Sequence, residues 1–289
     1  ISTYNTKYQG YVKGNGDNAW AGSIARGLEN RSLKWETTDT KNIGLDFGFF
    51  NNKLTGAMNY YYNQTEELLI TKALPPSAGL NNPILNVGKI RNSGVEVEIN
   101  WADSKGGFDY NIGMNFSTTK NKVVELADKG QVLYGEGLKY GTEHFPTQTR
   151  VGKPIGAFYL YKTNGLFQSN EEARQYVNAD GDEYQPFADA GDIRYVDVNG
   201  DGYIDDDDKV YCGSGIPTLE VNLNFSAGYK GFDLSVVLGS AWGHKIYNGN
   251  KYFYEGMNSG SNFLTSSLNA WTPQNTNTNI PRAIFNDPN

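Results

Sequence analysis

One short stretch of the chain has the spacing of a calcium-binding loop. Residues 197–208 read DVNGDGYIDDDD, so side-chain oxygens fall at loop positions one, three, five, nine and twelve. A glycine at position six suits the sharp turn of such a loop, and the carbonyl at position seven is a further ligand. Calcium takes about six to eight oxygen ligands at flexible geometry. The spacing predicts a divalent-cation site made by Asp197, Asn199, Asp201, Tyr203 (through its carbonyl), Asp205 and Asp208.

The loop departs from an EF-hand in two respects. Asp208 stands where an EF-hand has a longer, bidentate Glu, which leaves the choice between Ca2+ and Mg2+ open. Residues 193–196, directly before the loop, have an extended pattern instead of that of an amphipathic helix. We expect a structural Ca2+ clip outside an EF-hand fold, and a solvated acidic turn is the alternative.

Composition narrows the class of protein. The chain has 289 residues with 34 glycines, 20 tyrosines and a net charge of −7. This Gly-rich and Tyr-rich composition favours β-structure with many turns, and no basic stripe is present to bind nucleic acid. A single cysteine, Cys212, excludes an internal disulfide framework. His144 and His244 lie far apart in the sequence, which argues against a His-based zinc site.

Six segments alternate apolar and polar residues with the period of a β-strand. They pair across short turns at 51–53, 103–107 and 229–231, whereas the connections between pairs are much longer. The six segments are 42–50, 54–65, 94–101, 108–117, 218–227 and 232–242. Each has the length that crosses an outer membrane at a tilt, and the alternation of short turns with long connections is typical of outer-membrane barrels. A soluble sandwich is the alternative for alternation by itself.

Further features agree with a transmembrane barrel. No signal peptide and no run of 18 apolar residues is found, so a transmembrane helix is not expected. Aromatic residues near strand ends suit an interfacial girdle. These aromatic residues are Tyr60, Tyr61, Tyr62, Trp101 and Trp242.

The long connection spanning residues 119–217 contains the acidic loop 197–208, and we expect it to be extracellular. Within it, residues 169–172 read SNEE, a capping box that predicts a short helix continuing into ARQYV.

No catalytic constellation is apparent, so an enzyme is not expected. The sequence contains no G-x-S-x-G, H-E-x-x-H or Walker motif. Glu96 and Glu98 share a strand face and suggest paired glycosidase carboxylates, but a barrel lumen is routinely lined with such groups, which is the favoured interpretation.

Five stretches of the chain carry a resemblance to a known family: LKWETTDTKNIGLDFGFFNNKLTGAMNYYYNQTEELL (33–69), NVGKIRNSGVEVEINW (86–101), GDIRYVDVNGDGYIDDDDKV (191–210), SAGYKGFDLSVVLGSAWGHKIYN (226–248) and AWTPQNTNTNIPR (270–282). They resemble the SusC/RagA family of TonB-dependent outer-membrane transporters of Bacteroidota. The resemblance covers most of the chain in one order and implies an all-β fold, part of a large antiparallel transmembrane β-barrel of 22 strands. Residues 1–289 would be its C-terminal portion, without the plug domain.

The resemblance also implies a function and partners. Members of this family import large nutrients, glycan oligosaccharides or peptides, across the bacterial outer membrane. A SusD-like surface lipoprotein caps the barrel, and the TonB–ExbB–ExbD system acts through the plug. The barrel wall contacts outer-membrane lipid, and the long loops are extracellular.

Two other functions remain open. A calcium-braced surface glycan-binding protein or adhesin would hold its ligand without import. A secreted enzyme with a dockerin-type calcium site would need a second loop, for which NADGD (178–182) is the nearest candidate.

The acidic balance and the Tyr-rich loops favour a neutral oligosaccharide as the ligand. Loop aromatics could stack on sugar rings or meet the lipoprotein, with packing inside their own loops as the alternative. They are Trp20, Tyr134, Tyr140, Phe145, Tyr252, Phe253 and Tyr254.

Overall fold

A computed structural model describes residues 6–12, 19–25, 30, 32–71, 77, 81–135, 137–140, 142–257 and 262–284. The chain divides into two compact units. Unit 1 comprises residues 1–132, 150–155 and 216–243, and unit 2 comprises residues 133–149, 156–215 and 244–289.

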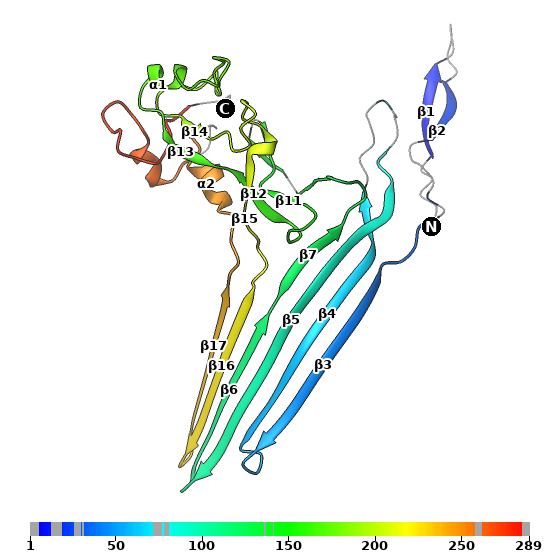
Figure 1. Cartoon of the computed structure of the whole chain (residues 1–289), viewed down its shortest axis with the longest axis vertical. Helices are drawn as coiled ribbons and strands as arrows, with labels where there is room; N and C mark the ends of the chain where they lie inside the picture. The colour runs from blue at the N-terminus through cyan, green and yellow to red at the C-terminus, as the bar shows by residue number, and fades with distance from the viewer. Residues whose placement is uncertain are drawn as a thin grey trace. The chain divides into compact units, whose positions relative to one another are not determined.

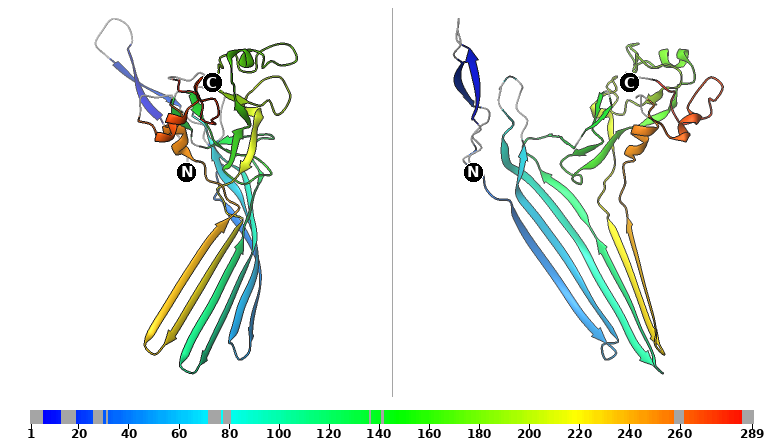
Figure 2. Two further views of the ribbon diagram at one scale, coloured as in Figure 1. Left: turned by 90° about the vertical axis from the view of Figure 1, so that its left-hand side faces the viewer. Right: turned by 180° about the vertical axis from the view of Figure 1, so that it is seen from behind.

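Unit 1 is built on a seven-stranded antiparallel sheet (Figure 1). Its strands follow the order β17-β16-β6-β5-β4-β3, and the short strand β7 also pairs with β5. The bounds are β3 Thr37–Phe49, β4 Leu54–Thr71, β5 Ile84–Lys105, β6 Phe108–Thr118, β7 Lys120–Glu125, β16 Leu219–Tyr229 and β17 Phe232–Trp242. All six predicted strands are present, and β4 and β5 extend well beyond the predicted segments. The turned views of Figure 2 show the twist of these long strands.

The register places the alternating side chains on two distinct faces. Leu45 pairs with Met58, Met58 with Val97, and Val97 with Phe116. Directly opposite residues in antiparallel strands share a face, so these apolar side chains form a row across four strands. The adjacent row on the other face is polar and contains Asp46, Glu98, Asn115 and Asn222.

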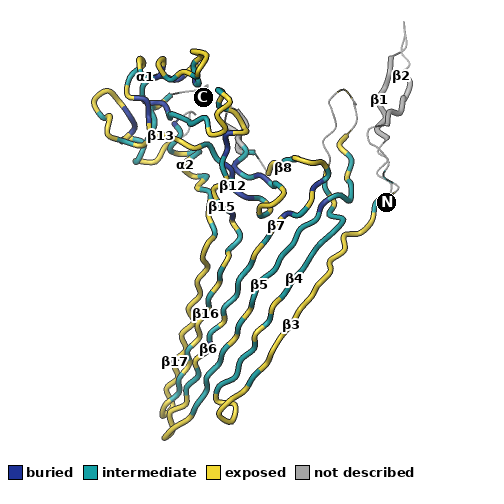
Figure 3. Tube along the Cα trace, viewed as in Figure 1, coloured by how far each residue is buried: buried dark blue, intermediate teal, exposed yellow. Residues whose placement is uncertain are grey.

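The apolar face is exposed to an unusual degree for large hydrophobic residues. Ile43 is 77% exposed and Leu238 is 59% exposed. Figure 3 shows the edge strands β3 and β17 exposed over most of their length. The sheet does not close on itself: within the described residues β3 and β17 each pair with one strand only. An open sheet with an exposed apolar face is consistent with the wall of a larger barrel.

The predicted aromatic girdle needs one correction. Tyr60 and Tyr62 lie on the apolar face, but the period of two places Tyr61 between them on the polar face. There its hydroxyl donates to the carbonyl of Thr118 at 3.2 Å. Trp101 lies on the apolar face near the turn, where its indole nitrogen donates to the Tyr110 hydroxyl.

The short turns form for local conformational reasons. The β3–β4 turn uses left-handed residues at Phe50, Asn51 and Asn52, a conformation that asparagine tolerates well. The β5–β6 turn uses Gly106 and Gly107, both with positive φ. A separate hairpin in unit 1 joins β1 (Thr6–Val12) and β2 (Ala19–Ala25).

Unit 2 contains several small elements instead of one large sheet. A four-stranded sheet has the order β15-β12-β11-β8, with bounds Lys209–Gly213, Ala157–Tyr161, Thr147–Thr149 and Leu133–Tyr134. Two further two-stranded antiparallel sheets pair β9 (Leu138–Tyr140) with β10 (Thr142–His144) and β13 (Thr163–Leu166) with β14 (Ile193–Tyr195). Its helical elements are α1 Asn170–Arg174, η2 Asp206–Asp208, α2 Gly249–Tyr254 and η3 Thr265–Asn269.

The long connection predicted over residues 119–217 is divided between the units. Its first residues form β7 in the large sheet, and residues 150–155 also belong to unit 1. The remainder is in unit 2, where Phe167, Ala173 and Ala188 form a small core against Tyr176.

The predicted short helix is present as α1, but it ends at Arg174 and does not continue through residues 175–177. The Ser169 hydroxyl accepts from the backbone nitrogen of Glu172, and the Glu172 carboxylate accepts from that of Gln168, one residue before the cap. The capping box therefore forms with one difference: the Glu172 carboxylate accepts from the amide of the residue before the N-cap instead of from the N-cap amide.

Across the described residues, no helix has both the length and the apolar character needed to span a membrane.

Candidate metal loop and its anchoring contacts

The acidic loop 197–208 is organised by its own backbone amides. Asp197 accepts from the amides of Gly200 and Gly202, at 2.6 and 2.9 Å. Asn199 accepts from Asp201 N, and Asp201 accepts from Tyr203 N. These Asx-type turns fold the segment around its early side chains and give the loop its curvature.

Asp208 closes the loop from its far end. Its side chain is fully buried, with one oxygen accepting from Val198 N and Asn199 N and the other from Asp205 N at 2.9 Å. Burial alone would raise the pKa of Asp208, but the hydrogen bonds from these three amides outweigh it and lower the pKa. The anionic Asp208, at loop position twelve, is thus hydrogen-bonded to the backbone at positions two, three and nine of the loop.

The turn and the flanks agree with the sequence prediction. Gly202, at position six, has φ +92°, the region that a residue with a Cβ rarely adopts. Before the loop lies β14, an extended strand, and η2 is followed directly by β15. The loop therefore lies between strands and not between the two helices of an EF-hand.

A clamp around Asp206 anchors the loop to the small sheet, and no local sequence pattern indicates it. The Asp206 carboxylate accepts from the hydroxyls of Tyr134 and Tyr161 at 3.2 and 3.3 Å, and Lys209 Nζ lies 2.7 Å away. The side chain of Lys209 is only 4% exposed, and its ammonium lies over the Tyr161 ring. Lys209 lowers the pKa of Asp206, while burial and the Asp206 charge raise that of Tyr161. Only the tertiary structure brings these distant tyrosines to one carboxylate.

The NADGD segment, 178–182, docks against the loop. The side chain of Asn178 accepts from the amides of Asp180 and Asp182, and its amide nitrogen donates to the carbonyl of Gly202 at 3.0 Å. Burial and the neighbouring Asp197 carboxylate raise the pKa of Tyr184, which follows this turn. The segment thus acts as a brace for the acidic loop.

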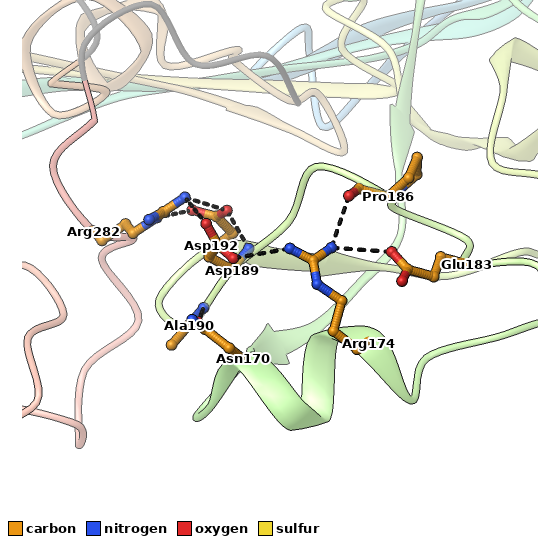
Figure 4. A network of polar contacts seen from close by, with 8 residues as sticks. All are labelled: Asn170, Arg174, Glu183, Pro186, Asp189, Ala190, Asp192 and Arg282. Carbon is orange, nitrogen blue, oxygen red and sulfur yellow. Dashed lines mark hydrogen bonds and ion pairs between the residues drawn. The ribbon is translucent and has the colours of Figure 1, made fainter.

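An arginine network ties a distant segment to the same unit (Figure 4). The guanidinium of Arg282 contacts Asp192 through two nitrogens, at 2.6 and 2.9 Å, and reaches Asp189 at 3.4 Å. Arg174 binds the other side of Asp189, and also Glu183 and the carbonyl of Pro186. This network joins the last described residues to the segment that precedes β14.

Calcium binding itself stays a prediction. In the described part of the chain, no three His, Cys, Asp or Glu side chains are gathered so as to hold a metal ion. The carboxylates of the four predicted aspartate ligands instead accept from backbone amides; these are Asp197, Asp201, Asp205 and Asp208. A carboxylate has about four lone-pair sites, so these hydrogen bonds leave capacity for a shared cation.

The predicted ligand-contacting aromatics differ in their surroundings. Tyr134 packs on Phe145 with ring centroids 5.3 Å apart, and Tyr252 packs on Phe253 at 5.1 Å. Tyr254 is 45% exposed at the end of α2. The side chains of Trp20 in β2 and Tyr140 in β9 lie outside the described part of the structure. Further exposed aromatics of unit 2, among them Phe187 and Tyr203, were not proposed as ligand contacts from sequence.

The fold and its two-faced strands define the wall of a membrane-type β-barrel, and comparisons with known proteins agree. Residues 2–239 match the family described as TonB dependent receptor-like, beta-barrel. TonB-dependent receptor P3 of Formosa agariphila is 31% identical over 98% of this chain and 28% of its own length. TonB-dependent receptor SusC of Bacteroides thetaiotaomicron is 27% identical over 83% of this chain and 22% of its own length.

A solved structure shares the fold. The structure of the RagAB peptide transporter matches with a TM-score of 0.71 at 21% identity, covering 97% of this chain and 29% of that chain. The chain therefore belongs to the TonB-dependent receptor β-barrel family, and its resemblance to SusC/RagA proteins is confirmed. It spans about a quarter of the length of the curated relatives that it matches.

Proposed function

We propose that the protein to which this chain belongs imports large nutrients across the bacterial outer membrane. In this proposal the chain supplies barrel wall and extracellular loops. The observation that carries the proposal is the register of the large sheet, which aligns apolar side chains in continuous rows on one face and polar side chains on the other. Such a wall faces lipid on one side and a polar lumen on the other.

Family membership supports a proposal for the energy source and the partner. The TonB–ExbB–ExbD system would act through a plug domain, and a SusD-like surface lipoprotein would present the ligand. The cargo is an oligosaccharide or a peptide. Exposed aromatics of unit 2, such as Tyr254, would offer rings for stacking on sugars or for contact with the lipoprotein.

The acidic loop has a bracing role in this proposal. Unit 2 has a small core, so its order depends heavily on polar contacts. A Ca2+ ion shared by the loop carboxylates would add a cross-link among residues 197–208 at the millimolar calcium levels found outside cells. Ca2+ is the structural ion proposed here, with Mg2+ as the competitor.

Native mass spectrometry of the full-length protein, extracted from its own cells in mild detergent, tests the proposal. A protein of about 100 kDa, the scale of a plug and a 22-stranded barrel, should co-purify with a lipoprotein. The mass of any retained ligand would distinguish oligosaccharide from peptide. A protein that binds oligosaccharide but fails to accumulate it in cells with an intact TonB system would instead be a surface-binding protein.

A further inference from the structure

Basic side chains gather on the outward face of the large sheet, directly beyond its apolar band. The apolar band is the set of large apolar residues on that face between the short turns and the level of Ile43 and Val95. Along β3 the next outward residue after Ile43 is Lys41, and along β5 Val95 is followed by Ser93 and Arg91. We define the basic belt as Lys41, Lys89, Arg91, Lys120 and Lys122.

The register brings the belt residues together on neighbouring strands. Arg91 lies directly opposite Lys122, and Ser93 lies opposite Lys120. On its other side, Ser93 is opposite Tyr62, which is opposite Lys41. Opposite residues share a face, so the belt residues of β3, β5 and β7 lie on the side that carries the apolar band.

Side-chain contacts orient part of the belt around one tyrosine. The Arg91 guanidinium lies over the Tyr62 ring at 5.1 Å and the Lys41 ammonium lies over it at 5.8 Å. Arg91 also donates to Gln64 at 3.1 Å. A tyrosine between an apolar band and cationic groups has the placement typical of the membrane–water interface.

Two lysines of the belt carry uncompensated charge. Lys120 and Lys122 are exposed, and neither forms an ion pair with any residue of the described ranges. Lys41 pairs with Asp39, and Lys89 pairs with Glu66. The carboxylates on this face at the level of the belt are Asp39, Glu66 and Glu125, against five basic groups.

Charge is therefore segregated between the faces of the sheet. The chain has a net charge of −7, yet the belt is positive. In the strands, the polar face carries six carboxylates and no basic side chain within the described residues. The six are Asp46, Glu96, Glu98, Asp109, Glu220 and Asp233.

We propose that the basic belt binds the phosphorylated headgroups of anionic lipids in the membrane leaflet at the β7 end of the sheet. This inference rests on the membrane location in the proposed function. Along β6 the apolar band runs from Phe108 to Phe116, about 27 Å of strand or about 21 Å at a tilt of about 40°. The belt comes next, at the depth where headgroup phosphates lie. Arginine and lysine bind phosphate oxygens through charge-assisted hydrogen bonds.

The test compares lipid retention by the full-length protein and two double variants, using native mass spectrometry. Each protein is mixed in detergent with equal amounts of phosphatidylglycerol and phosphatidylcholine, and separately with diphosphorylated lipid A. Lys120→Gln with Lys122→Gln removes the unpaired belt charges. Lys129→Gln with Lys162→Gln removes two exposed charges that belong to no strand of the large sheet and serves as the matched control.

The belt variant should lose about fivefold in anionic-lipid affinity for each lysine, and therefore about 25-fold for the pair. The control variant should keep the preference of the parent protein, as should Lys120→Arg with Lys122→Arg. Equal losses in the belt and control variants would overturn the proposal, as would lipid retention with no headgroup preference in the parent protein. Failure of the parent to retain any lipid would count against the membrane location itself and thus against the proposed function.

Discussion

Replacing Arg282 with methionine should loosen the segment of residues 271–282 by a predictable amount. Arg282 makes a two-point ion pair with Asp192, whose side chain is only 5% exposed. The substitution keeps much of the aliphatic volume but takes the Arg282 guanidinium away from a buried carboxylate. Breaking a fully buried pair costs about 3–5 kcal/mol. Since Arg282 is 24% exposed and water can replace part of its hydrogen bonding, we expect about 2–3 kcal/mol.

Hydrogen exchange of backbone amides measures this cost locally. The amide of Arg282 donates to the carbonyl of Gly191, and that of Trp271 donates to Ile280. A loss of about 2–3 kcal/mol should speed exchange at both amides by about 30- to 150-fold if opening is limited to this segment. Adding Asp192→Asn should recover part of the protection, because the buried charge is removed with its partner.

Arg174 provides the matched control in the same network. Its side chain is 45% exposed, so Arg174→Met removes a solvated ion pair that is worth no more than about 1 kcal/mol. We expect less than about a fivefold change at the same two amides. Equal acceleration in both arginine variants, or no acceleration with Arg282→Met, would refute the argument that burial of Asp192 sets the cost.

Three further predictions concern the acidic loop and the large sheet. Asp201→Asn should weaken Ca2+ binding and increase proteolysis of residues 168–216, whereas identical digestion with and without a chelator would show that the loop needs no ion. The lowered pKa of Asp208 means that its contribution to loop stability is present above about pH 4, its ordinary pKa, and is lost as the pH falls through the folded value. Pepsin cleavage of the loop should therefore rise steeply only below about pH 4, and Asp208→Asn should flatten that profile. Gly94→Ala should prevent assembly of the sheet, because a Cβ there would overlap a backbone carbonyl of the neighbouring strand. Gly228→Ala should be tolerated, because the nearest atom to its Cβ would be a movable carboxylate oxygen of Asp233 at 3.1 Å. The yield of heat-resistant folded barrel measures both, and equal yields would contradict the steric argument.

The sequence by itself determined the strands, their pairing by short turns and the two faces of the sheet. Strong alternation over nine or more residues, as in residues 42–50, has only one interpretation as secondary structure. The glycine at position six of the acidic loop and the serine cap of α1 were also predictable, because these are local backbone requirements. The alternation also assigns Tyr61 to the polar face. Its place in a run of three tyrosines led to its inclusion in the predicted aromatic girdle.

Only the tertiary structure decided which distant residues meet. The Asp206 clamp joins side chains up to 72 positions apart, and Arg282 reaches Asp192 across 90 positions. No local pattern encodes such pairs, because a long connection can fold back in many ways and the choice depends on which buried charges find partners. The basic belt has the same origin: its lysines and arginine belong to three strands, and the register of the sheet places them on one outward face.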